Sequence, residues 1–234
     1  MWLRCIRPNK TATEAPKAKL TGVAIHDGTL YIGSDKGTLY ALDGQLGALK
    51  WNFQTIEKIS GAPAVGMDGT VYVCALNSDK TKSVTYALNG FTGSQRWAAT
   101  HASQSAPSAA IGRDGSVFVT GVAPPVTTNG VSVPERAVAW PLDGHTGAQK
   151  WERWLEPGSA GVTAVSIDAV AILYVQAERS MTAEGAGKLS ALEPLTGSIL
   201  WEFVTNGSSN SIPAIGADGT VHAGSDDGRV YAIR

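Results

Sequence analysis

Histidine, cysteine and carboxylate side chains are the groups in this chain that could do chemistry, and their spacing fits few known sites. Two cysteines, Cys5 and Cys74, are too few for a disulfide framework or a four-ligand zinc site. No pair of the four histidines has the spacing of metal ligands; they are His26, His101, His145 and His222. Nucleophile-elbow, phosphate-loop and dinucleotide motifs are also missing. We therefore expect no metal, no cofactor and no catalytic residue.

Half of the 20 carboxylates lie in turn motifs, where an Asx side chain bonds the backbone two residues further on. These turn residues are Asp27, Asp35, Asp43, Asp68, Asp114, Asp143, Glu193, Asp218, Asp226 and Asp227. Asp168 follows a short apolar strand without the usual glycine, and it is the single carboxylate that invites an acid–base role.

The composition favours a globular all-β protein with many turns. The chain has 234 residues, 43% of them hydrophobic, with 27 glycines and a formal net charge of −1. This balance supplies no general field for nucleic acid or an anionic membrane. The first residues include Arg4 and Arg7 where an export signal needs apolar residues, and no run is long enough to cross a membrane. We expect a soluble chain without nucleic-acid binding or membrane insertion, and the compartment stays open.

An eleven-residue phrase ending in tryptophan recurs four times, at spacings of 46, 54 and 50 residues. The copies are ALDGQLGALKW (41–51), ALNGFTGSQRW (87–97), PLDGHTGAQKW (141–151) and ALEPLTGSILW (191–201). A repeat of this period predicts a propeller or a solenoid, because one unit cannot bury its apolar face alone.

Each repeat contains the elements of four antiparallel strands. A strand of small apolar residues comes first, and an Asp-Gly turn then leads into a β-branched strand, as in DGTLYIGS from Asp27. A third strand and a tryptophan strand follow. Four such strands make one propeller blade, with the small residues on the innermost strand where the blades converge. The fourth unit reads Asp168-Ala169 in place of Asp-Gly and must turn differently.

Over residues 20–234 the repeats resemble the pyrroloquinoline-quinone-like propeller family with its tryptophan-docking motif. The resemblance implies that each indole packs on the next blade, which would make Trp51, Trp97, Trp151 and Trp201 docking residues. It also raises the possibility of a quinone-dependent dehydrogenase, since such enzymes use adjacent cysteines, a stacking tryptophan and calcium ligands. Cys5 and Cys74 are not adjacent, and the inner strands offer no acidic cluster for calcium. The sequence therefore argues against the quinone site.

The sequence predicts one domain, residues 1–234, folded as an all-β propeller of about five four-stranded antiparallel blades. The first three strands occur five times, but the tryptophan strand occurs only four times before Arg234. Residues 1–6, with Trp2, are β-like and could supply the missing strand and close the ring, with 7–19 as a connector. The alternatives are a frayed N-terminus and a piece of a larger propeller.

Long loops between the second and third strands of the middle three repeats point to binding, because loops on a rigid scaffold carry function. These loops and the connectors between blades are expected on one face. The residues we expect to contact a partner are Lys80, Lys82, Arg136, Arg153, Trp154, Glu178 and Arg179. We expect a non-catalytic scaffold for a protein or peptide, and a carbohydrate ligand stays open. The alternative is a quinoprotein-related or carbohydrate-active enzyme.

Overall fold

The structure is a computed structural model, and it describes residues 18–55, 57–59, 61–105, 108–128, 131–133, 135–157, 164–167, 172–178, 186–208 and 212–234. Within these ranges every regular element is a β-strand and no helix occurs. The all-β fold class predicted from the sequence is confirmed.

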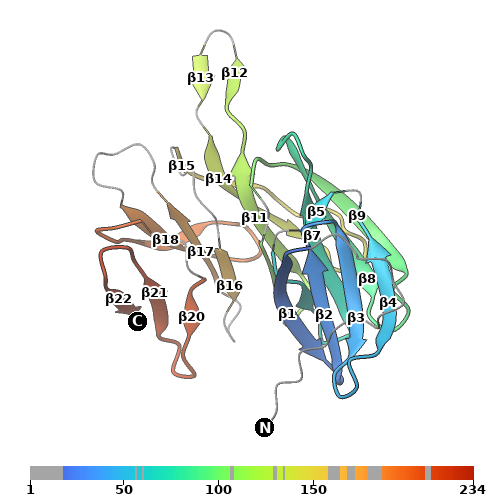
Figure 1. Cartoon of the computed structure of the whole chain (residues 1–234). Coiled ribbons are helices and arrows are strands. Elements are labelled where there is room, and N and C mark those ends of the chain that lie inside the picture. The colour runs from blue at the N-terminus through green and yellow to red at the C-terminus, as the bar shows by residue number, and fades with distance from the viewer. Residues whose placement is uncertain are drawn as a thin grey trace.

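Five antiparallel sheets, blades 1 to 5, follow one another along the chain, one for each repeat (Figure 1). Blade 1 consists of β1 (Leu20–His26), β2 (Thr29–Ser34), β3 (Thr38–Asp43) and β4 (Leu49–Gln54). Blade 2 consists of β5 (Lys58–Ile59), β6 (Ala64–Val65), β7 (Thr70–Leu76), β8 (Lys82–Asn89) and β9 (Gln95–Ala102). Blade 3 consists of β10 (Ser108–Ile111), β11 (Val117–Ala123), β14 (Arg136–Leu142) and β15 (Arg153–Pro157). Blade 4 consists of β16 (Ala164–Ile167), β17 (Leu173–Glu178), β18 (Gly187–Leu192) and β19 (Ile199–Val204), and blade 5 of β20 (Ala214–Ile215), β21 (Val221–Gly224) and β22 (Val230–Ile233).

The long insertion of blade 3 forms a hairpin of its own, which the sequence analysis treats as a loop. It consists of β12 (Val126–Thr128) and β13 (Val131–Val133) and stands clear of the blades (Figure 1). Its strands read VTT and VSV, and Val and Thr are residues that favour strands. The hairpin projects because β11 and β14 remain paired up to Ala123 and Arg136, directly below it.

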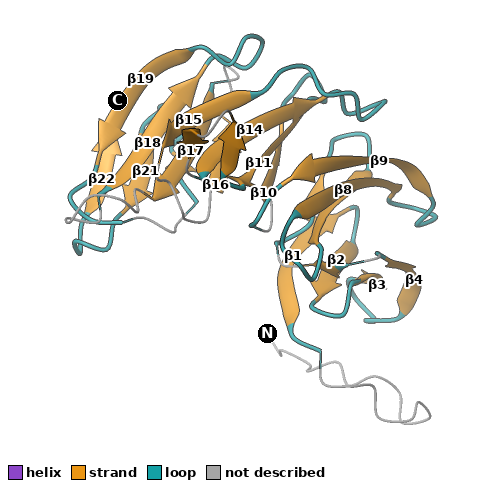
Figure 2. Cartoon of the chain, turned by 90° about the horizontal axis from the view of Figure 1, so that it is seen from above, coloured by secondary structure: helices purple, strands orange, loops and turns teal. Residues whose placement is uncertain are grey.

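The small-residue strands lie on the inside of the fold, as predicted. β1, β6, β10 and β16 are neighbours from one blade to the next, and the blades follow an arc (Figure 2). Four apolar clusters join blades 1 and 2, 2 and 3, 3 and 4, and 4 and 5. Each blade is therefore held by its neighbours, as expected of a repeat fold.

The tryptophans dock between blades. The indole Nε1 of Trp51 donates a hydrogen bond to the carbonyl oxygen of Gly90 in the next blade, at 2.8 Å. Trp97 does the same to Gly144, and Trp151 to Pro194, both at 2.9 Å. These bonds give the first three repeated tryptophans a structural role.

Gly147 shows how tightly an indole docks. The residue has a φ of 74°, and a Cβ built on it would lie 2.7 Å from ring atoms of Trp97. Replacing Gly147 by alanine should therefore add overpacking to the strain of positive φ and lower the free energy of unfolding by about 2–3 kcal/mol. Urea unfolding measures this change.

Gly219→Ala is the matched control for that substitution. Gly219 has a φ of 83°, but a Cβ added to it would meet no heavy atom within 4 Å. Its replacement should lower stability by about 1–2 kcal/mol through backbone strain alone. Equal losses in the two variants would show that the indole of Trp97 does not fill the space beside Gly147.

The two ends of the arc expose apolar strand faces. Ile25 in β1 is 70% exposed, and Val230 in β22 is 75% exposed. Leu39 in β3 occupies the same repeat position as Val230 but is fully buried between blades 1 and 2. Blade 5 has three strands, and in the described part of the chain nothing pairs with the outer edge of β22. Residues 1–6, the predicted closing strand, lie outside the described residues, so closure stays a prediction.

Candidate binding face

One edge of the blades gathers both the loops between second and third strands and the connectors between blades. The backbone N–H of Thr55, in the connector after β4, donates to the carbonyl oxygen of Gly37 in the β2–β3 turn. In blade 4, Thr205 after β19 donates to Gly187 at the start of β18 in the same way. The loops and connectors therefore share one face, as predicted. We call it the loop face, and the opposite edge the turn face.

A groove of about 340 Å³ lies on the loop face between blades 1 and 2. It is formed by the β2–β3 turn, the connector between the blades and the β7–β8 loop. Its lining residues are Asp35, Lys36, Glu57, Lys58, Leu76, Asn77, Ser78 and Lys80. Lys80 thus lines a groove, and Lys82 begins the strand that follows this loop. We call this feature the lysine groove.

Lys36 and Lys58 are groove residues that the sequence analysis did not select. The signal was present, because Lys36 lies in the tight turn GSDKG and Lys58 in a connector, and both kinds of segment are expected on the loop face. Because the predicted contact residues came from the long loops and the connectors of the middle repeats, the short turn of blade 1 was left out. Only the packing of two adjacent blades brings these side chains to one groove.

Hydrogen bonds hold the backbone that carries Lys80. The side-chain oxygen of Asn77 accepts from the backbone N–H groups of Thr81 at 3.0 Å and Lys82 at 2.8 Å. Lys80 itself has a φ of 55° and donates its N–H to the backbone oxygen of Asn77. A non-glycine residue at positive φ is uncommon and marks a tight turn. The β7–β8 loop is therefore a defined turn.

The predicted residues of blade 3 divide between two sheet faces. Trp154 in β15 pairs with Val138 in β14, so Trp154 and Arg136 lie on the same face of the blade, the face toward blade 2. Arg153 lies next to Trp154 along the strand and therefore on the other face, toward blade 4. Trp154 is 40% exposed, and the Nε atoms of Arg136 and Arg153 are buried without a hydrogen-bond partner. The structure therefore places Arg136 and Trp154 on one face of blade 3 and Arg153 on the other.

The two remaining predicted residues belong to blade 4. Glu178 is the last residue of β17 and pairs with Gly187, which places its backbone at the loop face. Arg179 lies outside the described residues, as does Asp168.

The turn face offers a second surface, which the sequence analysis did not single out. Docking turns and Asp-Gly turns meet there, since the N–H of Gly44 donates to the carbonyl oxygen of Gly28. Phe91 at the tip of one docking turn is 92% exposed, and other large apolar side chains are similarly exposed along this edge; they are Leu46, Met67 and Leu195. A groove of about 470 Å³ lies on the same face between blades 2 and 3.

Carboxylates in the turn-face groove are engaged by hydrogen bonds and cations of their own blade. Arg96 Nη1 lies 3.0 Å from Asp68 Oδ2, and Lys150 Nζ lies 3.9 Å from Asp114 Oδ2. Burial alone would raise the pKa of Asp114, but hydrogen bonds from Ser116 and the nearby Lys150 outweigh it and lower that pKa. The basic residue before the docking tryptophan thus stabilises the Asp-Gly turn region in blades 2 and 3, a structural role.

Cys74 tests the quinone site that the family resemblance implies. Its neighbours in β7 are Val73 and Ala75, so it has no adjacent cysteine, and its thiol lies 3.5 Å from the hydroxyl of Thr85. Burial raises the pKa of the Cys74 thiol to about 11, which keeps it protonated. The described residues do not fit a site built on paired cysteines, and Cys5 lies outside them.

Metal-binding clusters and membrane-spanning helices are both absent from the described ranges. No group of three His, Cys, Asp or Glu side chains there is arranged to hold a metal ion. In the same ranges no helix is long and apolar enough to span a membrane.

The chain matches the family model described as outer membrane protein assembly factor BamB over residues 9–123 and again over 86–234. No curated protein matches its sequence. Among solved structures it is similar to the quinohemoprotein alcohol dehydrogenase of Comamonas testosteroni, with 15% identity and a TM-score of 0.65, over 91% of this chain and 40% of that one. A europium-containing methanol dehydrogenase matches with 13% identity and a TM-score of 0.50, over 90% of this chain and 66% of that one.

BamB from Moraxella catarrhalis matches with 20% identity and a TM-score of 0.48, over 90% of this chain and 75% of that one. The chain spans less than two thirds of the two dehydrogenases, and at these identities the likeness to the enzymes concerns the fold alone.

Proposed function

The chain belongs to the family of the outer membrane protein assembly factor BamB, and on this premise we propose that it is a non-catalytic scaffold that binds a protein or peptide through its loop face. Its fold is also that of a quinohemoprotein dehydrogenase, so the fold by itself does not select the function. The proposal therefore depends on the surface of this chain.

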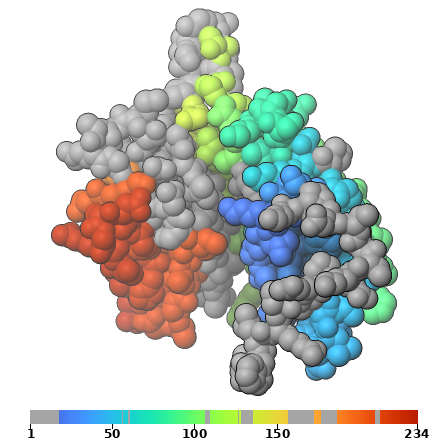
Figure 3. Space-filling model, in the orientation of Figure 1, coloured from blue at the N-terminus to red at the C-terminus, as the bar shows by residue number. Residues whose placement is uncertain are grey.

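The observation that carries the proposal is that the loops between second and third strands and the connectors between blades lie on one edge. Lys80 lines a groove there, and Trp154, on the same face of blade 3 as Arg136, is 40% exposed. Tryptophan and arginine are enriched at the energetic centres of protein interfaces. The projecting hairpin β12–β13 adds two strands at the same edge (Figure 3).

Site-specific photo-crosslinking in cells tests which face binds. A benzophenone amino acid at Lys82 or Trp154 reports on the loop face, and the same group at Leu46 or Phe91 reports on the turn face. We expect the loop-face positions to capture one common protein that the turn-face positions do not. Capture from Leu46 and Phe91 alone would move the binding surface to the turn face and contradict the proposal.

A loop exchange supplies the second variant. Residues 124–135 are replaced by a tight Gly-Ser-Asp-Gly turn, which keeps the β11–β14 pairing because Ala123 pairs with Arg136. We expect the captured band to weaken by about tenfold or more, as for the loss of a central contact. An unchanged melting temperature confirms that the exchange leaves the blades intact.

A further inference from the structure

The lysine groove differs from the turn face in how its charges are paired. On the turn face, Arg96 and Lys150 lie within ion-pair distance of carboxylates of their own blade. Among the described residues, no ion pair engages any lysine of the groove: Lys36, Lys58 and Lys80. In the described part of the chain, these three ammonium groups therefore have no carboxylate within ion-pair distance, although Asp35 and Glu57 also line the groove.

Two carboxylates around the groove already accept hydrogen bonds from groups of the chain. Asp35 Oδ1 accepts the backbone N–H of Lys19 at 3.0 Å, and Asp79 Oδ1 accepts the N–H and hydroxyl of Thr81. Glu57 is the remaining carboxylate of the lining. Lys19 and Lys82 add two lysines beside the groove, next to Asp35 and Asn77. The balance around the groove is basic, although the whole chain carries a net charge of −1.

The elements that carry the lysines are fixed before any partner binds. Next to Lys36, Gly37 has a φ of 79°, and a Cβ there would lie 2.6 Å from the backbone oxygen of Glu57. The hydroxyl oxygen of Thr55 lies 2.8 Å from the backbone oxygen of Gly37 and 2.5 Å from that of Glu57, so its single proton can be donated to either. The β2–β3 turn and the connector are thereby held together. Such pre-organisation lowers the entropic loss on binding.

The chemistry of the lining suits an acidic peptide. Leu76 supplies an apolar contact, Asn77 and Ser78 supply hydrogen-bonding groups, and the lysines supply cations. A volume of about 340 Å³ accommodates a few side chains. Binding of single-stranded nucleic acid combines a basic groove with aromatic side chains for base stacking, and all the lining residues here are non-aromatic.

We propose that the lysine groove between blades 1 and 2 binds an acidic, extended peptide segment, whose carboxylates pair with Lys36, Lys58 and Lys80. This inference rests on the proposed function, since it names the chemistry of the partner at the loop face. Exposed ion pairs are individually weak, so recognition depends on several pairs together and weakens as salt is added.

Fluorescence anisotropy with a fluorescein-labelled oligoglutamate decapeptide tests the inference, with an oligoglutamine decapeptide and a ten-nucleotide single-stranded DNA as comparison probes. We expect the full chain to bind oligoglutamate at an ionic strength of about 0.05 M and more weakly at about 0.3 M. Lys36→Gln, Lys58→Gln and Lys80→Gln combined should weaken binding by about tenfold or more. Oligoglutamine should not bind.

The matched control removes three exposed cations elsewhere: Arg113→Gln, Arg229→Gln and Arg234→Gln combined. We expect its affinity for oligoglutamate to stay within about twofold of the unmodified chain, because screened charges act over only about 10 Å. An equal loss in both triple variants would show that net charge alone attracts the peptide, and the inference would fall.

Two other results would overturn it. Tighter binding of the DNA than of oligoglutamate, with the same dependence on the three lysines, would assign the groove to nucleic acid. No binding of oligoglutamate would reject the acidic peptide, while crosslinking from Trp154 would still support the proposed function. Failure of crosslinking at the loop face would instead reject the proposed function itself.

Discussion

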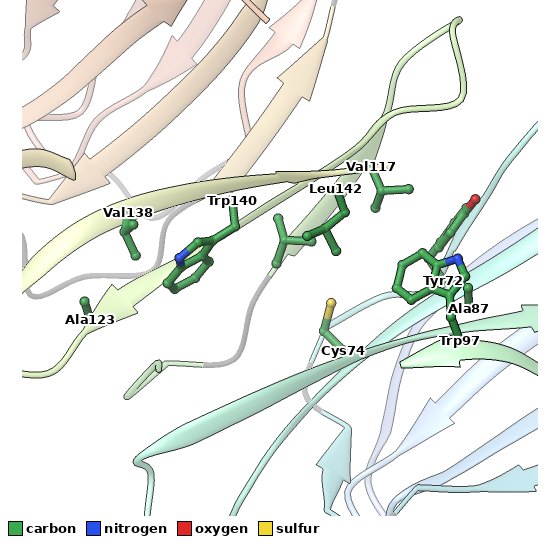
Figure 4. Packing of buried hydrophobic residues seen from close by; sticks show 10 residues of the cluster. Tyr72, Cys74, Ala87, Trp97, Val117, Ala123, Val138, Trp140 and Leu142 are labelled. Atoms are coloured by element: carbon green, nitrogen blue, oxygen red, sulfur yellow. The ribbon is translucent and has the colours of Figure 1, made fainter. Parts of the chain in front are cut away.

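Replacing Trp97 by alanine is expected to lower the free energy of unfolding by about 3–5 kcal/mol, the range for removing a buried large aromatic side chain. Trp97 is 8% exposed and packs beside Tyr72 between blades 2 and 3, with ring centroids 5.8 Å apart (Figure 4). Its Nε1 also donates to Gly144 of blade 3. The substitution therefore opens a cavity and removes a contact between two blades. Urea unfolding followed by far-ultraviolet circular dichroism measures the loss.

Trp201→Ala is the control, because Trp201 contacts Tyr174 at the same centroid distance of 5.8 Å but its indole makes no hydrogen bond among the described residues. We expect a clearly smaller loss than for Trp97. The stability loss of Trp97→Phe should lie between those of Trp97→Ala and Trp201→Ala, because this variant retains an aromatic ring but removes the N–H donor. Similar losses for Trp97→Ala and Trp201→Ala would contradict the view that docking onto the next blade is what makes the tryptophan important for stability.

Stability is expected to fall as the pH is lowered from about 6.5 to about 4, because of His101. This residue is 4% exposed and stacks on Trp140 with ring centroids 5.0 Å apart. Its Nε2 lies 3.4 Å from the hydroxyl of Thr85, and its Nδ1 is buried without a hydrogen-bond partner. Burial lowers the pKa of His101 from 6.5 to about 4, so the folded chain keeps the ring neutral where the unfolded chain already protonates it.

The sign follows from proton binding. Between the two pKa values the unfolded state binds more protons, so stability is complete above pH 6.5 and declines as the pH falls toward 4. At about 1.4 kcal/mol per pH unit, the full loss is on the order of 3 kcal/mol. Turn carboxylates such as Asp114, whose pKa is lowered below 3.8, contribute to acid unfolding only at lower pH.

Urea unfolding at pH 7, 6 and 5 checks this prediction against His101→Phe, which keeps an aromatic ring against Trp140 but cannot titrate. The variant should show a markedly flatter pH dependence over this range. The same slope in both proteins would place the acid sensitivity in other groups.

Several parts of the fold were predictable from local pattern. The Asp-Gly turn at Asp27 has positive φ at both central residues, which is the conformation such a pair favours. The docking role of Trp97 follows from a motif of fixed spacing, and the loop face follows from strand order alone. Strand alternation and turn chemistry act within a few residues, so they can be read without knowing the rest of the chain.

The candidate site was only partly predictable. Lys80 lies in a long loop and Lys82 begins the strand that follows it, so both could be predicted from that insertion, but Lys36 and Lys58 belong to a short turn and a connector. Arg153 and Trp154 are sequence neighbours, yet strand alternation turns them to opposite faces of blade 3. Which of the two residues faces blade 2 depends on the register of β15 against β14, which no local pattern specifies.

The order of residues is enough to define this chain as an all-β propeller of repeated blades, because period, turn chemistry and the docking motif are local properties. Which side chains share a surface depends instead on the packing of the blades. Lys58 and Lys80 lie 22 residues apart and meet at one groove because two blades pack side by side. Arg96 and Asp68 pair because the tryptophan strand of blade 2 returns beside the Asp-Gly turn of the same blade. Lysines without an ion pair, as in the described lysine groove, can be recognised only after such pairings are known, because pairing depends on distances that folding creates.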